Sequence, residues 1–297
     1  MLDQIRTIAR RAGLRRFWRR ATPGNFLPHE TTPEAIADQV DYALGCGRSY
    51  LDRLKGLGVA VEEASILEVG PGIAFGAMAY LRAHGAKVAV ADAWLAPWRD
   101  PFHPAFYAKL TEAIEEEAPN ADVSFLHRAI ANGGYDDEFI SLHKREAEAL
   151  SDIESGSIDF VFSNAVLEHL RAPSKAFEEL HRVTRSGGYG VHQVDFRDHR
   201  DFSNPLEHLL LSAKEFSVLS KQVHREYGAQ MRQPEYADLL NRAGFSIIDY
   251  HSNDSADEFY LDTFEPRLRA SPKSPYKDCP RETLADLGGL FTVQRPA

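Results

Sequence analysis

The chain of 297 residues has a formal net charge of −10, with 43 % hydrophobic and 26 % charged residues, which is the balance of a folded globular protein. The acidic balance argues against a general nucleic-acid binder, and no run of about 18 apolar residues predicts a membrane-spanning helix. Cys46 and Cys279 lie far apart without metal-ligand spacing, and the first residues do not read as a secretory signal, so we expect a reduced, cytoplasmic protein.

Residues 1–20 hold seven arginines against one aspartate, with apolar residues on the opposite face of a predicted helix. Two interpretations stay open for this basic amphipathic helix. It packs on the domain or on a second subunit of a homo-oligomer, or it contacts an anionic membrane surface or an acidic partner protein. A linker with proline and glycine reaches residue 30, so we divide the chain into residues 1–30 and one larger domain at 31–297.

Hydrophobic runs and glycine or proline breaks predict alternating strands and helices along the larger domain. The first helix is expected to begin at Thr31 or Thr32, with Pro33 in its first turn, and a second helical piece to end at Gly56. Strands are predicted at residues 65–69, 87–91, 122–127, 158–163, 189–194, 245–250 and 289–294. Helices are predicted from the first glycine turn to residue 84 and at 205–211, 213–220 and 234–243, and the proline-rich segment 252–286 is expected to be irregular.

The segment SILEVGPGIAFGAMAY at residues 65–80 reads as a buried strand, a tight glycine turn and the start of a helix. Gly70 and Gly72 would let the backbone approach a ligand, and the turn would aim the N–H groups of the next helix at it. Glu68 precedes the first glycine by two residues. An acid there is unsuited to the pyrophosphate of a dinucleotide, but it can attract the ammonium end of an amino acid that carries a sulfonium group.

This EVGPG pattern resembles motif I of the class I S-adenosylmethionine-dependent methyltransferases, and the order of later motifs extends the resemblance over residues 60–250. The resemblance implies S-adenosylmethionine as cofactor. It also implies an α/β fold: a Rossmann-like, seven-stranded, mostly parallel sheet with helices on both faces. To this we add N-terminal helices, a helical substrate cap, and insertions at residues 93–144 and 200–235.

Further cofactor contacts follow from the order of the motifs. Asp92 ends the second strand, where a carboxylate can accept both hydroxyls of a ribose, and it corresponds to motif II of the family. The run EAE resembles the loop that meets the adenine ring, and SNAVLEHL is similar to the motif IV region. The predicted cofactor-binding residues are Glu68, Gly70, Gly72, Asp92, Ala93, Glu146, Ala147, Glu148 and Asn164.

Titratable residues gather where the fifth strand ends, in the sequence HQVDFRDH. In open α/β sheets this edge faces the ligand crevice, so we predict that His192, Asp195 and His199 form the acceptor side of the site. A hydroxyl acceptor needs help to lose its proton, and a histidine suits that task near pH 7. His192 or His199 is the favoured general base, and His169 is expected rather to position the ligand.

The predicted activity is methyl transfer to a hydroxyl of a sugar, a glycan end or a small metabolite. Three alternatives remain: a metal-assisted O-methyltransferase, an N-methyltransferase, and a cofactor-binding partner subunit without turnover of its own. His192, Asp195 and Asp198 could hold magnesium, but Ser163 and Asn164 stand where such sites place an acid, so no metal is predicted.

Overall fold

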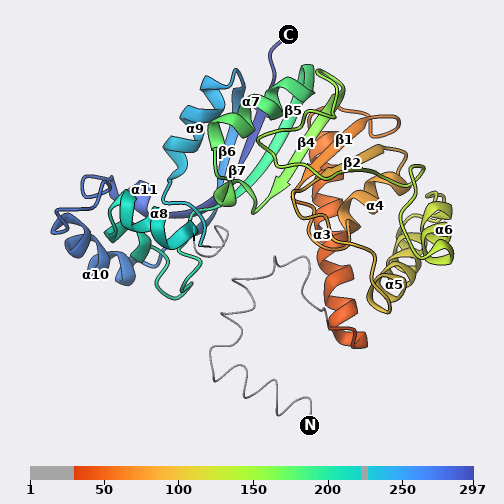
Figure 1. Cartoon of the computed structure of the whole chain (residues 1–297), viewed down its shortest axis with the longest axis horizontal. Coiled ribbons are helices and arrows are strands. Elements are labelled where there is room, and N and C mark those ends of the chain that lie inside the picture. Colours follow the sequence, from red (N-terminus) through yellow and green to blue (C-terminus); the bar gives the residue numbers. More distant parts are fainter. Residues whose placement is uncertain (1–29, 222–226) are drawn as a thin grey trace.

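The computed structural model describes residues 30–221 and 227–297 (Figure 1). Its centre is a seven-stranded sheet in the order β3-β2-β1-β4-β5-β7-β6. Strand β7 runs antiparallel to both of its neighbours, and all other pairs are parallel. The predicted Rossmann-like, seven-stranded, mostly parallel sheet is therefore confirmed.

The elements follow one another in the alternating order expected of an α/β fold. The strands are β1 (Ser65–Val69), β2 (Lys87–Ala91), β3 (Ser141–His143), β4 (Ile158–Asn164), β5 (Thr184–Asp195), β6 (Ser246–Ser255) and β7 (Asp286–Gln294). The α-helices are α3 (Pro33–Gly56), α4 (Gly76–Ala83), α5 (Phe102–Glu117), α6 (Ser124–Asn132), α7 (Pro173–Val183), α8 (Ala213–Lys221), α9 (Gln233–Arg242), α10 (Glu258–Arg269) and α11 (Arg281–Ala285). Two short 3₁₀ helices are η2 (Leu167–His169) and η3 (Glu207–Leu210).

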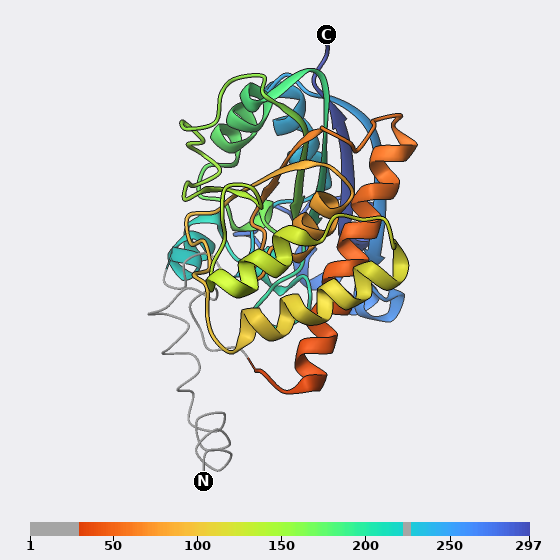
Figure 2. The ribbon, with the colours of Figure 1, turned by 90° about the vertical axis from the view of Figure 1, so that its right-hand side faces the viewer.

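The sheet separates two hydrophobic cores. Ile66 of β1 faces the core formed with α3, α4, α5 and α6, whereas Leu67 and Val69 face the core formed with α7 and α9. Figure 2 shows α3, α5 and α6 lying together on one side of the sheet. Because successive strand residues point to opposite faces, this short apolar run can fill both cores at once.

Helix α3 begins as the sequence predicted, with the N–H of Ala35 donating to Thr32 Oγ1 at 3.2 Å and Pro33 in the first turn. It then continues without a break to Gly56, so the predicted division into two pieces is wrong. Gly47 lies against α4, where a Cβ would come within 2.7 Å of Tyr80. This glycine therefore allows close packing of two helices rather than ending one of them.

The strand predicted at residues 122–127 is wrong, because α6 begins there. Asp122 Oδ1 accepts the N–H of Ser124 at 3.0 Å, and Phe125, Leu126 and Ala129 bury the inner face of the helix. The third strand is instead Ser141–His143, which pairs with β2. Its three residues are too few to show a periodic pattern in the sequence.

The expectation of an irregular segment at 252–286 is also wrong. It contains α10 and α11, and Asp257 caps α10 by accepting the N–H of Phe259 at 2.9 Å. With η3 these helices form a separate small core that contains Leu206, Leu209, Leu261, Phe264, Leu268 and Leu284. Together with α8 this lobe lies beside the carboxyl end of the sheet (Figure 1), as expected of a helical cap.

The helix predicted at residues 1–20 lies outside the residues that the structure describes. Across residues 30–221 and 227–297, none of the helices has the length and apolar character needed to cross a membrane.

Candidate functional site

Two adjoining cavities flank the glycine turn at the carboxyl ends of β1 and β4. The first has a volume of ≈ 300 Å³ and is lined by Val69, Gly70, Gly72, Ala91, Asp92, Ala93, Trp94, Glu146, Ala147, Glu148, Ala165, Val166, His169, Leu170 and Arg171. The second has a volume of ≈ 320 Å³ and extends from the same turn toward α3 and α5. They share Gly70, Gly72, Ala165 and Val166, so the turn lies at the centre of one composite cleft.

Each glycine of the turn is required for a different reason. Gly70 has φ +70° and packs so closely on Val166 that a Cβ would lie 2.3 Å from Val166 Cγ2. Gly72 has φ +72°, but a Cβ there would meet no atom within 4 Å, so it leaves open space beside the cleft. Gly76 packs between α3 and α5, where an added Cβ would lie 2.5 Å from Ala43 and 2.8 Å from Phe106. Gly72 is thus the glycine that leaves room for a ligand.

Glu68 lies on β1 and lines the second cavity. Its side chain is buried, and Tyr50 of α3 donates its hydroxyl to Glu68 Oε1 at 2.9 Å. Burial raises the pKa of Glu68 to about 7, and the hydrogen bond from Tyr50 opposes that shift only in part. A cation beside this carboxyl would favour its ionised form, which fits the ammonium group of an amino-acid ligand.

Asp92 directly follows β2 and lines the first cavity. The N–H of Trp94 donates to Asp92 Oδ1 at 2.6 Å, while burial raises the pKa of the carboxyl. Ala93 and Trp94 line the same cavity, so Trp94 belongs to the wall of the site. Trp98, by contrast, packs at 5.2 Å on the ring of His103 and lines neither cavity.

The acidic run at residues 146–148 lies along the first cavity. Glu148 Oε1 accepts the N–H groups of Arg171 at 2.8 Å and Ala172 at 3.1 Å, and Glu146 pairs with the Arg171 guanidinium at 3.3 Å. These contacts join the run to the loop after η2. Glu148 is therefore held by the protein backbone, and Ala147 offers an apolar surface between the two acids.

Asn164, at the end of β4, lies in the second cavity and donates its amide to Tyr42 Oη of α3 at 3.0 Å. Gln39 and Cys46 of α3 line the same cavity. The residues predicted from the sequence did not include this polar side of α3. The spacing of Gln39, Tyr42 and Cys46 by three and four residues is the signal that could have shown it.

His192 is fully buried, and its Nδ1 lies 2.8 Å from Ser163 Oγ across the neighbouring strand. Burial lowers the pKa of its imidazole to about 4, and the residue lines neither cavity. The reason is positional, since β5 continues three residues past His192 and keeps it inside the sheet. This placement does not support the predicted role of His192 at the acceptor.

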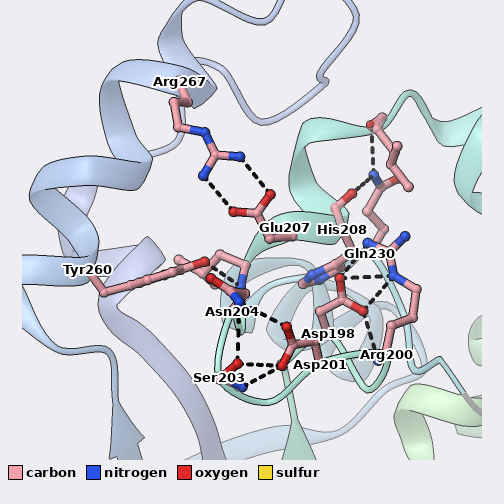
Figure 3. A network of polar contacts seen from close by, with 12 residues as sticks. Asp198, Arg200, Asp201, Ser203, Asn204, Glu207, His208, Gln230, Tyr260 and Arg267 are labelled. Atoms are coloured by element: carbon pink, nitrogen blue, oxygen red, sulfur yellow. Dashed lines mark hydrogen bonds and ion pairs between the residues drawn. The ribbon is translucent and has the colours of Figure 1, made fainter.

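Asp198 is buried and accepts from Arg200 Nε at 2.8 Å. Figure 3 shows that it belongs to an internally bonded loop, in which Asp201 accepts from Asn204 at 2.9 Å and Glu207 pairs with Arg267 of α10. Within the described ranges, no three His, Cys, Asp or Glu residues are arranged to hold a metal ion. The three suggested magnesium ligands His192, Asp195 and Asp198 each have a different partner.

Asp195, His199 and His169 do come together. His199 Nε2 lies 3.4 Å from Asp195 Oδ2, and the rings of His199 and His169 are 5.1 Å apart. Burial alone would raise the pKa of Asp195, but the nearby imidazole of His199 and the hydrogen bonds from Arg197 outweigh it and lower the pKa well below its usual range. Of these residues His169 lines the first cavity. Asp195 is therefore a carboxylate at neutral pH, and it lies next to His199, whose ring contacts that of His169.

Glu168 is the other acid of this group. Burial raises its pKa to about 8, and its Oε1 lies 4.0 Å from His169 Nε2. At neutral pH this carboxyl is mostly protonated, because the charged form is disfavoured in its buried position and beside Asp195. Asp195 thus carries the negative charge of the group.

A family profile described as "Methyltransferase domain" matches residues 107–191, which span α5 to β5 and do not include the glycine turn. No curated protein matches the chain.

Three solved structures are similar to this chain at low sequence identity. A candidate sarcosine dimethylglycine methyltransferase from Galdieria sulphuraria is 16 % identical, with a TM-score of 0.49 over 85 % of this chain and 86 % of that one. Phosphoethanolamine N-methyltransferase 2 of Haemonchus contortus is 16 % identical, with a TM-score of 0.47 over 84 % of this chain and 53 % of that one. An S-adenosylmethionine-dependent methyltransferase from Mesorhizobium loti is 15 % identical, with a TM-score of 0.46 over 82 % and 96 %.

Proposed function

We infer that this chain, a class I S-adenosylmethionine-dependent methyltransferase by its fold, its glycine turn and its matched domain, methylates a hydroxyl of a sugar, a glycan end or a small metabolite. The methyl-transfer proposal rests on the positions of two acids. Two acids, Glu68 and Asp92, lie in adjoining cavities on either side of an open glycine turn. That arrangement fits a ligand with a cationic amino-acid end and a nucleoside end.

The residues present fit S-adenosylmethionine. Glu68 would hold the ammonium group, Asp92 the ribose hydroxyls, and the surface around Ala147 the adenine. Gly72 leaves the space beside the turn that such a ligand needs. When bound, this cofactor supplies a methyl group already activated by a positively charged sulfur. The protein has then to align the acceptor with that methyl group and to exclude water.

We assign proton removal from the acceptor to His169, because it lines the composite cleft around the glycine turn and neither His192 nor His199 does. His199 and Asp195 act as positioning residues behind it, as in an acid–histidine pair. The negative charge of Asp195 would stabilise the positive charge that forms when a histidine takes the proton. This moves the base from strand β5, where the sequence suggested it, to the turn after β4.

The experiment is a transfer assay with methyl-labelled S-adenosylmethionine and a panel of sugar, phenol and amine acceptors. The wild-type chain and H169A are compared, with H251A as a control at an exposed histidine of β6. Loss of transfer to a hydroxyl in H169A alone supports the proposal. Full hydroxyl transfer by H169A would remove the assigned base, and transfer to amines alone would replace O-methylation by N-methylation.

A further inference from the structure

The glycine turn is also held in place by α5, a helix that does not adjoin it in the sequence. His103 Nε2 lies 2.9 Å from the carbonyl oxygen of Ile73, and Tyr107 donates its hydroxyl to the carbonyl oxygen of Ala74 at 2.6 Å. Both side chains are buried, and both come from α5, one helical turn apart. Two consecutive carbonyl groups of the turn are therefore bound by two consecutive turns of one helix.

The ring of His103 has a defined proton arrangement. The N–H of Arg99 donates to His103 Nδ1 at 2.8 Å, so Nδ1 acts as an acceptor, and the N–H at Nε2 donates to the carbonyl oxygen of Ile73. Burial lowers the pKa of this imidazole, and the nearby charges of Arg99 and Asp100 have opposite effects on it. The support is therefore made by a neutral, oriented histidine.

The turn has a backbone that needs such support. Phe75, its last residue, has φ +49°, a left-handed conformation that non-glycine residues adopt at a cost. Its ring is buried at 4.9 Å from Tyr135. Because Phe75 directly precedes α4, its conformation fixes the direction of the first N–H groups of that helix. A strained residue of this kind persists only where its surroundings hold it in place.

We propose that His103 and Tyr107 are positioning residues for the cofactor: they hold the turn in the shape that binds an adenosyl amino acid. This inference rests on the proposed function. It assigns a role to part of the insertion predicted at residues 93–144. Neither residue lines the two cavities, so the effect on the ligand acts through the backbone of Ile73 and Ala74.

The test measures binding of S-adenosylhomocysteine by calorimetry, together with the unfolding temperature, for four variants. H103L and Y107F remove the two donors, and H103Q keeps a neutral donor near the place of Nε2. T111V is the matched control, because the buried Thr111 hydroxyl donates to the carbonyl of Tyr107 within α5 at 2.8 Å and does not touch the turn.

We expect H103L and Y107F to weaken binding about 2- to 13-fold, the range for the net contribution of one hydrogen bond. H103Q should restore most of the affinity, and T111V should bind as the wild type does even if its unfolding temperature falls. Wild-type affinity in both H103L and Y107F, or an equal loss in T111V, would overturn the proposal. If the wild-type chain itself does not bind S-adenosylhomocysteine, the proposed function fails instead, which separates the two results.

Discussion

Tyr50 donates its hydroxyl to Glu68, and this bond joins the long helix α3 to the acid of the glycine motif. The phenol ring of Tyr50 also stacks on Phe162 of β4 at 3.8 Å, so its position is fixed by the sheet. Glu68 is therefore buried beside the second cavity, where it accepts one hydrogen bond. Its ionisation should then depend on what binds beside it.

Binding of the cofactor should release a proton near neutral pH. The pKa of Glu68 is raised to about 7, so at pH 6.5 most of the protein carries a protonated Glu68, and a bound ammonium group would favour the carboxylate. Affinity for S-adenosylhomocysteine should therefore fall as the pH decreases below 7. Calorimetry at pH 6.5 in buffers of different ionisation enthalpy measures the release. E68Q should bind weakly and without it, and equal release by E68Q would refute the assignment.

Asp92 should contribute to affinity for the nucleoside part. D92N keeps the shape of the side chain and removes its charge, so it should weaken binding of S-adenosylhomocysteine by about 1–3 kcal/mol, the scale of unpaired buried polar groups. D249N, at an exposed position of β6, is the matched control and should leave binding unchanged. Binding by D92N that equals that of the control would show that the ribose lies elsewhere.

His169 should affect the chemical step rather than cofactor binding. Removal of a general base lowers a rate by about 10²–10⁴-fold, so H169A should lose most transfer to a hydroxyl and keep its affinity for S-adenosylhomocysteine. H199A and D195N should show smaller losses, because these residues act through His169. The ratio of transfer rate to cofactor affinity in each variant is the measurement. Parallel losses of both quantities would indicate a structural role.

His192 should make the fold sensitive to acid. The pKa of His192 in the folded chain is lowered from 6.5 to about 4. As the pH falls, the unfolded chain therefore takes up this proton at a higher pH than the folded chain does, and the stability should decrease between pH 6.5 and pH 4. The shift corresponds to about 3 kcal/mol at the acid end. H192Q cannot take up the proton and should show a flatter dependence of unfolding free energy on pH over that range. An unchanged slope in H192Q would assign the acid sensitivity to other groups.

Much of the part of the site that is expected to bind the cofactor could be predicted from the sequence. Strands β1 and β2 are short apolar runs that end in glycine or an acid, and the carboxyl ends of neighbouring parallel strands meet at one edge of the sheet. Gly72 and Asp92 therefore had to lie near each other. The position of Gly76 between Ala43 and Phe106 could not be read from spacing, because it depends on how three helices pack.

The part of the site that is expected to bind the methyl acceptor was harder to predict, since it depends on where β5 ends and on which way its side chains point. The sequence HQVDFRDH does not show that β5 continues to Asp195, which buries His192 and leaves Asp195 and His199 near the edge. The contact of Tyr42 with Asn164 joins residues 122 positions apart, and no local pattern encodes it. The support of the turn by His103 and Tyr107 is another contact over a long distance in sequence.

Binding of S-adenosylmethionine in the composite cleft is measured by calorimetric titration of the wild-type chain with S-adenosylhomocysteine. NAD serves as the control ligand, because it shares the adenosine part and lacks the amino-acid end. We predict saturable binding of one S-adenosylhomocysteine per chain with a dissociation constant on the order of micromolar, and no binding of NAD. Absence of heat with S-adenosylhomocysteine, or tighter binding of NAD, would show that the cleft is not a site for S-adenosylmethionine.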